Sequence, residues 1–147
     1  MPHIHHRVGI KASPESVYAA LTTLEGLAGW WTPQTAGDPG KGGTIEFRFG
    51  EWGGPDMHVT EATLARRVEW RVVRGKGQWE GTTISFELEP AGEHTGVRFR
   101  HAGFATEEAD FAHVSAKWVV FLLSLKAFVE RGQGTPFPSE AKIDEHN

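Results

Sequence analysis

Residues 106–132 read TEEADFAHVSAKWVVFLLSLKAFVERG, and this stretch decides the fold. It has the start and stop signals of one long helix: Thr106 can cap a first turn, acids follow where the helix dipole is positive, and Gly132 is a common stop. Large apolar residues recur between these signals at steps of three and four: Phe111, Val114, Trp118, Phe121, Leu122, Leu125 and Val129. This spacing places them on one stripe. The sequence therefore predicts a helix over 106–132 that packs on a sheet.

The back of this helix is apolar as well. Val119, Val120, Leu123 and Phe128 lie off the main stripe, and a helix that is apolar nearly all the way round buries more than one face. We expect its back to be covered either by two short helices near the N-terminus or by a second subunit. A homodimer is the favoured arrangement, with an interface above ~1,000 Å² in total.

Length and composition exclude several classes of protein. The 147 residues fit one domain, 1–147, and the absence of cysteine excludes a disulfide framework, a thiolate nucleophile and a cysteine metal site. A net charge of -4 without a basic stripe argues against a nucleic-acid partner. No signal-peptide pattern and no apolar run of the ~20 residues that cross a bilayer are present, so we expect a cytoplasmic protein without a membrane partner.

The N-terminal third of the chain predicts one strand, two short helices and a loop. His3 to Ile10 alternates between apolar and polar residues, which is typical of a strand. Ser13-Pro14-Glu15 supplies an N-cap, a proline and a first-turn acid for a short helix. A second short helix is expected over Leu24 to Trp31, and the Gly-rich stretch from Thr35 to Gly43 is expected to be a loop.

Five further strands are predicted before the long helix. The alternating segments are Thr44 to Gly50, Met57 to Ala65, Arg67 to Arg74, Trp79 to Pro90 and Thr95 to Ala102. Short turns separate them, so consecutive strands should pair antiparallel. The apolar parity changes near Thr60 or Glu61, which predicts a bulge. The tail after about residue 133 is expected to be irregular.

The last two predicted strands should form a hairpin with a defined register. Its inner face should carry Phe86, Phe99 and His101, and we expect Phe86 opposite His101. Glu87 would then face Arg100, and Glu89 would face Arg98, on the outer face of the sheet.

At this point several segments together resemble a known family: Ala12 to Tyr18 with Leu21, Leu27 to Trp31, Trp79 to Thr82 leading into Phe86-Glu87-Leu88, Phe99 to Gly103, and Trp118 to Gly132. The chain resembles the START-like helix-grip (SRPBCC) superfamily and, within it, the family of the activator of the heat-shock-protein-90 ATPase. The resemblance implies an α+β fold with a curved antiparallel sheet, here six-stranded, gripping the long C-terminal helix. It also implies that the first strand lies beside the last and that an apolar cavity separates sheet and helix.

Candidate site residues follow from the faces of these elements. Six Trp and nine Phe against one Tyr supply rings suited to an apolar core or cavity. We expect a cavity of roughly 300 to 1,000 Å³ that binds a small hydrophobic molecule. The candidate ligand-binding residues are Trp30, Trp31, Phe47, Trp70, Phe86, Phe99, His101, Trp118, Leu122, Leu125 and His6.

The histidines leave two interpretations open. On the inner face, His101 has the chemistry to orient a ligand or move a proton, but we favour a core histidine bonded to a backbone carbonyl, because no strand-borne acid shares its face. If the first and last strands are neighbours, His6 would share one end of the cavity with His101. His3 and His5 provide only two ligands, so no metal site is expected. Asp110, His113 and Ser115 diverge around a helix and do not form a triad.

Three function classes remain on this evidence. The first is binding of a small hydrophobic or aromatic ligand, for which no cofactor is required. The second is an enzyme similar to polyketide cyclases or aromatases, with catalytic residues that the sequence does not identify. The third is a co-chaperone-like interaction module, which only the resemblance suggests. Polar groups converging in the cavity would favour the enzyme, and a fully packed interior would favour the interaction module.

Overall fold

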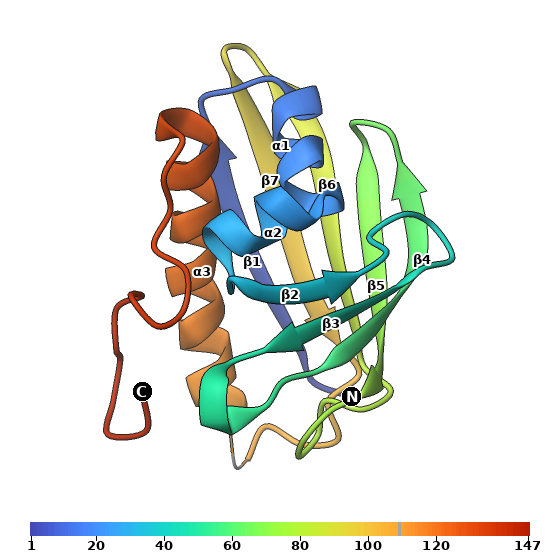
Figure 1. The fold of residues 1–147 in the computed structure, drawn as a ribbon, viewed down its shortest axis with the longest axis vertical. Coiled ribbons are helices and arrows are strands. Elements are labelled where there is room, and N and C mark those ends of the chain that lie inside the picture. Colours follow the sequence, from blue (N-terminus) through green and yellow to red (C-terminus); the bar gives the residue numbers. More distant parts are fainter. Residues whose placement is uncertain (109) are drawn as a thin grey trace.

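The computed structural model describes residues 1–108 and 110–147. Its described part has an antiparallel sheet of seven strands in the order β1-β7-β6-β5-β4-β3-β2, which curves around the helix α3 (Phe111–Arg131) (Figure 1). The strands are β1 His3–Ile10, β2 Gln34–Gly37, β3 Thr44–Arg48, β4 Asp56–Thr63, β5 Arg67–Arg74, β6 Thr83–Ala91 and β7 His94–Ala102. Two short helices, α1 (Pro14–Thr22) and α2 (Leu24–Trp30), lie in front of the sheet, and a 3₁₀ turn, η1 (Gly50–Trp52), follows β3. The α+β helix-grip fold is confirmed, including the pairing of β1 with β7.

The predicted number of six strands is wrong by one. β2 lies at the start of the stretch that was expected to be a loop, and it pairs antiparallel with β3. Thr32 fixes this pairing, because its hydroxyl donates to the Arg48 carbonyl over 2.7 Å. A four-residue edge strand of Gln, Thr, Ala and Gly has no apolar alternation, so the sequence carries no period-two signal for it.

The start of the long helix was also misplaced. α3 begins at Phe111 rather than near Thr106, and its N-cap residue, Asp110, makes no side-chain cap hydrogen bond. Thr106 instead closes a turn before the helix, where its hydroxyl accepts from the Glu108 amide over 2.7 Å. The predicted end is confirmed, since Gly132 is left-handed and its amide donates to the Phe128 carbonyl.

The hairpin of β6 and β7 has the predicted faces but not the predicted register. Phe86 lies opposite Phe99 rather than His101, and Glu87 lies opposite Arg98 rather than Arg100. The turn lies one residue earlier than that register requires, at Gly92 and Glu93, because Ala91 pairs with His94. Glu89 still contacts Arg98, but as a diagonal ion pair of 3.3 Å. The bulge predicted in β4 is confirmed by a register shift between Val59 and Glu61.

The back of α3 is only partly covered by this chain. Phe128 contacts Gly29 of α2, and the tail after Gly132 returns along the helix without forming a helix or strand of its own (Figure 1). Val119 and Leu123 remain exposed. By length and composition alone α3 would be able to cross a membrane, but core helices of soluble domains pass the same test, and α3 lies on the sheet.

Candidate functional site: a ring-lined cavity beside the long helix

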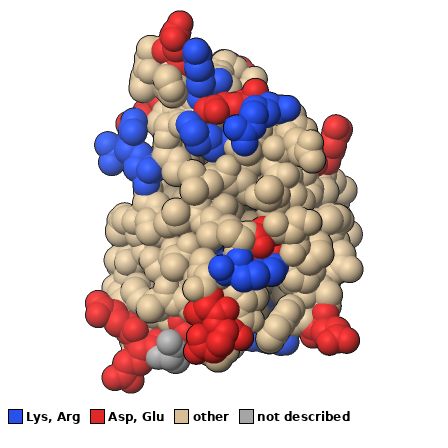
Figure 2. All heavy atoms as spheres, turned by 90° about the vertical axis from the view of Figure 1, so that its left-hand side faces the viewer, with Lys and Arg blue, Asp and Glu red and all other residues tan. Residues whose placement is uncertain are grey.

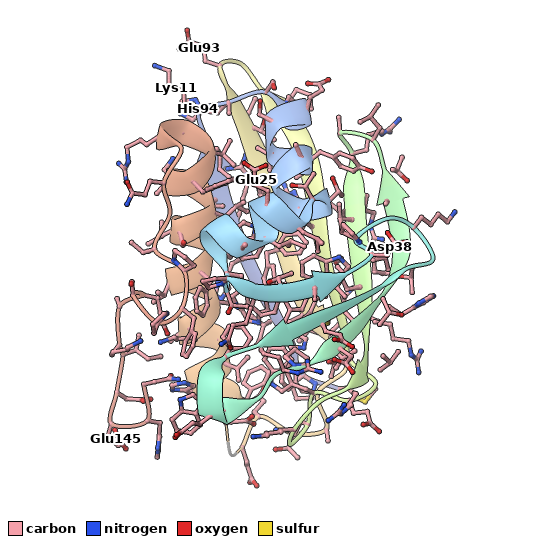
Figure 3. The ribbon with its side chains drawn as sticks, in the orientation of Figure 1. Lys11, Glu25, Asp38, Glu93, His94 and Glu145 are labelled. Carbon is pink, nitrogen blue, oxygen red and sulfur yellow. The ribbon has the colours of Figure 1, made fainter. Side chains whose placement is uncertain are left out.

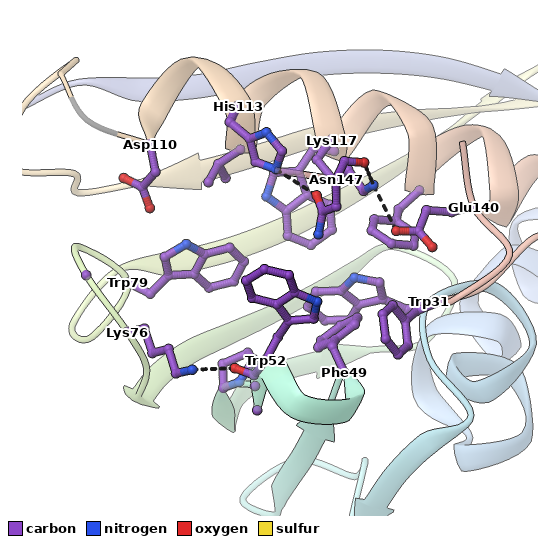
Figure 4. A pocket seen from close by; sticks show the side chains of 18 residues that line it. Trp31, Phe49, Trp52, Lys76, Trp79, Asp110, His113, Lys117, Glu140 and Asn147 are labelled. Atoms are coloured by element: carbon purple, nitrogen blue, oxygen red, sulfur yellow. Dashed lines mark hydrogen bonds and ion pairs between the residues drawn. The ribbon is translucent and has the colours of Figure 1, made fainter. Parts of the chain in front are cut away.

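A cavity of about 310 Å³ lies beside the N-terminal half of α3. Its other walls are the segment around η1, the β5–β6 turn and the C-terminal tail. In Figure 4, Trp52 and Trp79 face the α3 side chains across this space. Seven aromatic side chains contribute to the lining: Trp31, Phe49, Trp52, Trp79, Trp118, Phe121 and Phe137. A space of this size and lining is at the lower end of the range for small-molecule pockets.

Local structure explains how these rings meet. Trp31 follows the last turn of α2, where its amide donates to Leu27, and its ring contacts Trp118 at 5.0 Å between centroids. Trp79 is held in the β5–β6 turn because its carbonyl accepts from the Thr82 hydroxyl over 2.5 Å. Trp52 ends η1 and is 59% exposed, and its carbonyl accepts from Lys76. The buried rings thus form the inner wall, and Trp52 marks the open side.

The tail supplies the polar wall of the cavity. Lys117 of α3 forms a buried ion pair of 2.8 Å with Glu140 and also donates to the Asn147 carbonyl over 2.8 Å (Figure 4). Burial alone would raise the pKa of Glu140, but its hydrogen bonds to Lys117 and Lys142 outweigh this and hold the pKa below its usual value. These bonds fix the tail to the helix.

His113 is the second anchor of the tail. Its two ring nitrogens lie 2.7 Å from the Asp144 carboxylate and 2.9 Å from the Asn147 side chain. The hydrogen bond with His113 is the main reason that the pKa of Asp144 falls to about 2. The acid that partners His113 therefore comes from the tail and not from Asp110, in agreement with the rejection of a triad within the helix.

His101 is buried beside this cavity but does not line it. Its Nδ1 accepts from the Trp118 indole N–H over 3.1 Å, so the ring proton is on Nε2, which lies 2.9 Å from the Thr82 hydroxyl. Burial lowers the pKa of His101 to about 3, so the imidazole is neutral at pH 7. The partners differ from the expected backbone carbonyl, but both nitrogens are used within the core.

His6 and His101 do not form a joint site. They lie on neighbouring strands, with His6 opposite Phe99 and His101 opposite Ile4. The His6 ring bonds the Ser115 carbonyl of α3 over 3.0 Å, whereas His101 bonds Thr82 and Trp118. The low pKa of His101 results from burial rather than from a second imidazole. Within the described part of the chain, no group of three or more potential ligands is placed to hold a metal.

The candidate ligand residues separate into two groups. Trp31 and Trp118 line the cavity. The others, which do not line it, are Trp30, Phe47, Trp70, Phe86, Phe99, His101, Leu122, Leu125 and His6. All of these except His6 are buried, and their rings contact one another. The ring centroids of Trp70 and Phe86 are 5.2 Å apart, and those of Phe86 and Phe99 are 5.3 Å apart. The space expected among them is filled by these side chains. The cavity lies nearer the N-terminal end of α3.

Several lining residues were not among the candidates. Trp52 and Trp79 lie in glycine-containing turns, and a large ring in such a turn cannot be a regular strand residue facing the core. That signal was available in the sequence. The contributions of Phe137, Glu140 and Asn147 were not, because a polar, irregular tail has no periodicity that predicts where it docks.

Comparisons with known proteins agree with the fold. A family described as Activator of Hsp90 ATPase homolog 1-like protein matches residues 11–130. No curated protein matches the chain. The solution structure of the Aha1 dimer from Colwellia psychrerythraea is 47% identical, with a TM-score of 0.83, over 91% of this chain and 100% of that one.

More distant structures share the fold alone. CalU16 from Micromonospora echinospora is 21% identical, with a TM-score of 0.76, and the match covers 97% of this chain and 74% of that one. A protein from Mesorhizobium loti is 19% identical with the same TM-score, over 88% of this chain and 98% of that one. With the family match spanning most of the domain, the chain belongs to the Activator of Hsp90 ATPase homolog 1-like family.

Proposed function

We propose that this protein binds a small hydrophobic or aromatic molecule in the cavity beside the N-terminal half of α3. The observation that carries the proposal is the set of aromatic rings around a space of about 310 Å³. Such rings stabilise a flat apolar ligand through burial and through offset or edge contacts. The size favours a ligand of one or two fused rings or a short acyl chain over a full-length lipid.

The proposal is tested by filling the cavity from the helix side. Val114 lines the cavity, and Val114→Phe adds a ring into the space. Val73→Phe is the matched control, because Val73 is exposed on β5 and outside the lining. In calorimetric titrations with naphthalene-sized compounds and short fatty acids, Val114→Phe should weaken binding about 10-fold or more, as overpacking of about 1–3 kcal/mol implies, and Val73→Phe should not. Equal affinities of both variants and the wild type, or no binding by the wild type, would refute the proposal.

A second candidate is a chaperone interaction module. It is favoured by the 47% identity to an Aha1 protein and by the filled interior between β3, β5, β6, β7 and α3. The direct test is the ATPase rate of a purified heat-shock-protein-90-type chaperone with and without this protein. Stimulation would support the module, and an unchanged rate together with no co-sedimentation would exclude it. The cyclase-like alternative gains no such support, since both nitrogens of His101 are already bonded.

We also propose that the protein forms a homodimer. The support is the 47% identical relative from Colwellia psychrerythraea, which is described as a dimer. Sedimentation of the wild-type protein at tens of micromolar tests this directly. A dimer mass is the expected result, and a monomer at high micromolar concentration would contradict it.

A further inference from the structure

The exposed face of α3 carries a continuous apolar stripe. Its members are Ala112, Ala116, Val119, Val120, Leu123 and Ala127, whose spacing of three and four places them on one side of the helix. Val119 is 38% exposed and Leu123 is 52% exposed. Only 39% of an 18-residue apolar segment of α3 is buried within this chain, so the helix has more apolar surface than the core of this chain covers. Surfaces of this kind mark interaction sites.

Charged residues are absent from this stripe. Between Asp110 and Lys126 the helix contains one formally charged residue, Lys117, and that side chain is buried in its ion pair with Glu140. The tail docks on the Lys117 side of the helix, and β1 meets its other side where His6 bonds Ser115. Figure 2 shows this side of the molecule with a band free of charged side chains at mid-height, and one small cluster of charged side chains lies just below it near the centre.

The stripe is symmetric about its own midpoint. Ala112 and Ala127, Ala116 and Leu123, and Val119 and Val120 are each equally far from the point midway between Val119 and Val120. In a twofold dimer with antiparallel helices, residues equally distant from the axis face each other. Every apolar residue of the stripe would then meet another apolar residue of the stripe.

The charges at the two ends of α3 fit the same arrangement. Glu107, Glu108 and Asp110 precede the helix, whereas Lys126 and Arg131 are in its last turns and Lys11 lies beside its C-terminal end (Figure 3). In Figure 2, Lys and Arg predominate above the uncharged band and Asp and Glu below it. Glu130 is an acid at the basic end, but it is paired with Lys126 at 2.9 Å. In an antiparallel pair of α3 helices, the acidic segment before the helix of one copy, which includes Glu108, would lie beside the basic end of the other copy, which includes Arg131.

We propose that the α3 stripe is the interface of the homodimer, with the two α3 helices antiparallel across a twofold axis near Val119 and Val120. This inference rests on the homodimer proposed above and adds the surface and its geometry. The free edge of β1 is the competing interface. Its outward side chains include His3, His5 and Arg7, and polar or charged residues on an edge strand oppose pairing with another strand.

The first test uses the lack of cysteine in the chain. Val119→Cys introduces a single thiol near the proposed axis, and Leu64→Cys introduces one in an exposed turn far from it. Under mild oxidation, Val119→Cys should give a disulfide-linked dimer and Leu64→Cys should remain uncrosslinked. A mixture of Ala116→Cys and Leu123→Cys proteins should yield mainly the mixed dimer. Preferential linkage of each variant to itself would contradict the antiparallel arrangement.

The second test separates the interface from the dimer itself. Val119→Glu places a charge in the stripe of both copies and should raise the dimer dissociation constant on the order of 100-fold or more in sedimentation, with an unchanged thermal unfolding profile of the monomer. Leu64→Glu is the matched control and should stay dimeric. A monomeric wild type would refute the homodimer. A dimeric wild type whose dimer is unaffected by Val119→Glu would leave the homodimer in place and refute this interface.

A charge exchange tests the antiparallel orientation. Glu108→Arg and Arg131→Glu should each weaken the dimer a few-fold at low salt, because each places like charges at the two helix ends that lie side by side. The double variant should regain the wild-type dissociation constant, since opposite charges then face each other again. A double variant weakened by the product of the two single effects would show that these residues do not meet.

Discussion

His101 has two hydrogen-bond partners that determine the protonation state of its ring. It accepts from Trp118 at Nδ1 and contacts the Thr82 hydroxyl at Nε2, and a second ring proton would remove the acceptor that Trp118 uses. The geometry therefore requires a neutral ring. Burial penalises the charged ring and lowers the pKa of His101 to about 3, in agreement with this geometry.

The low pKa of His101 predicts acid sensitivity. Between pH 6.5 and about 3 the unfolded chain binds a proton at this position and the folded chain does not, so the free energy of unfolding should fall as the pH is lowered below 6.5. The slope should approach about 1.4 kcal/mol per pH unit. Urea unfolding of His101→Phe should show lower stability at pH 7, by about 1–3 kcal/mol for the buried Trp118 indole N–H that loses its acceptor, and a flatter profile from pH 6.5 to 5.

The control for this experiment is His5→Phe, which changes an exposed histidine of β1 and keeps His101. It should retain the acid-dependent loss. If His101→Phe and the wild type lose stability in parallel between pH 6.5 and 5, His101 is not the source of the acid sensitivity, and its assignment as a neutral core histidine is contradicted.

The anchor of the tail gives a second residue-level prediction. Glu140→Ala leaves the Lys117 ammonium without its buried partner and should lower the free energy of unfolding by about 1–3 kcal/mol. Glu145→Ala is the control, because Glu145 is exposed and lies in the same tail (Figure 3). Limited proteolysis should cut the tail faster in Glu140→Ala than in Glu145→Ala. Equal cutting rates would show that the ion pair does not hold the tail.

Among the elements, the faces of the strands could be predicted from the sequence, whereas the register of one hairpin and one edge strand could not. The faces of β5, β6 and β7 follow from the period of two in their apolar residues, and those faces were predicted correctly. The register between β6 and β7 depends on which residues form the turn, and alternation does not reveal this. β2 was missed for the related reason that its sequence has no alternation.

Two hairpin turns give a prediction about backbone strain. Ala65, between β4 and β5, has a φ of 59°, and Gly92, between β6 and β7, has a φ of 66° with no atom near its missing Cβ. A side chain in this left-handed region costs about 1–2 kcal/mol. Ala65→Gly should therefore raise the melting temperature and Gly92→Ala should lower it. Shifts in the same direction in calorimetry would contradict this explanation.

For the whole molecule, the position of the cavity was only half predictable. A ring-lined space beside α3 follows from the curved sheet and the aromatic composition, and of the candidate residues Trp31 and Trp118 line it. The remaining candidates pack against each other because large rings on facing strands fill the centre of the sheet. The cavity lies where the tail, η1 and the β5–β6 turn meet α3, and irregular segments of this kind dock through contacts that no sequence period encodes.

The most direct measurement is an NMR titration of the six tryptophan indole N–H signals with a naphthalene-sized ligand. Trp31, Trp52, Trp79 and Trp118 line the cavity, whereas Trp30 and Trp70 do not. Binding in the cavity predicts saturable shifts that are largest at Trp52 and Trp79 and smallest at Trp30 and Trp70. Largest shifts at Trp30 and Trp70, or no saturable shift at any indole, would contradict a ligand site in this cavity.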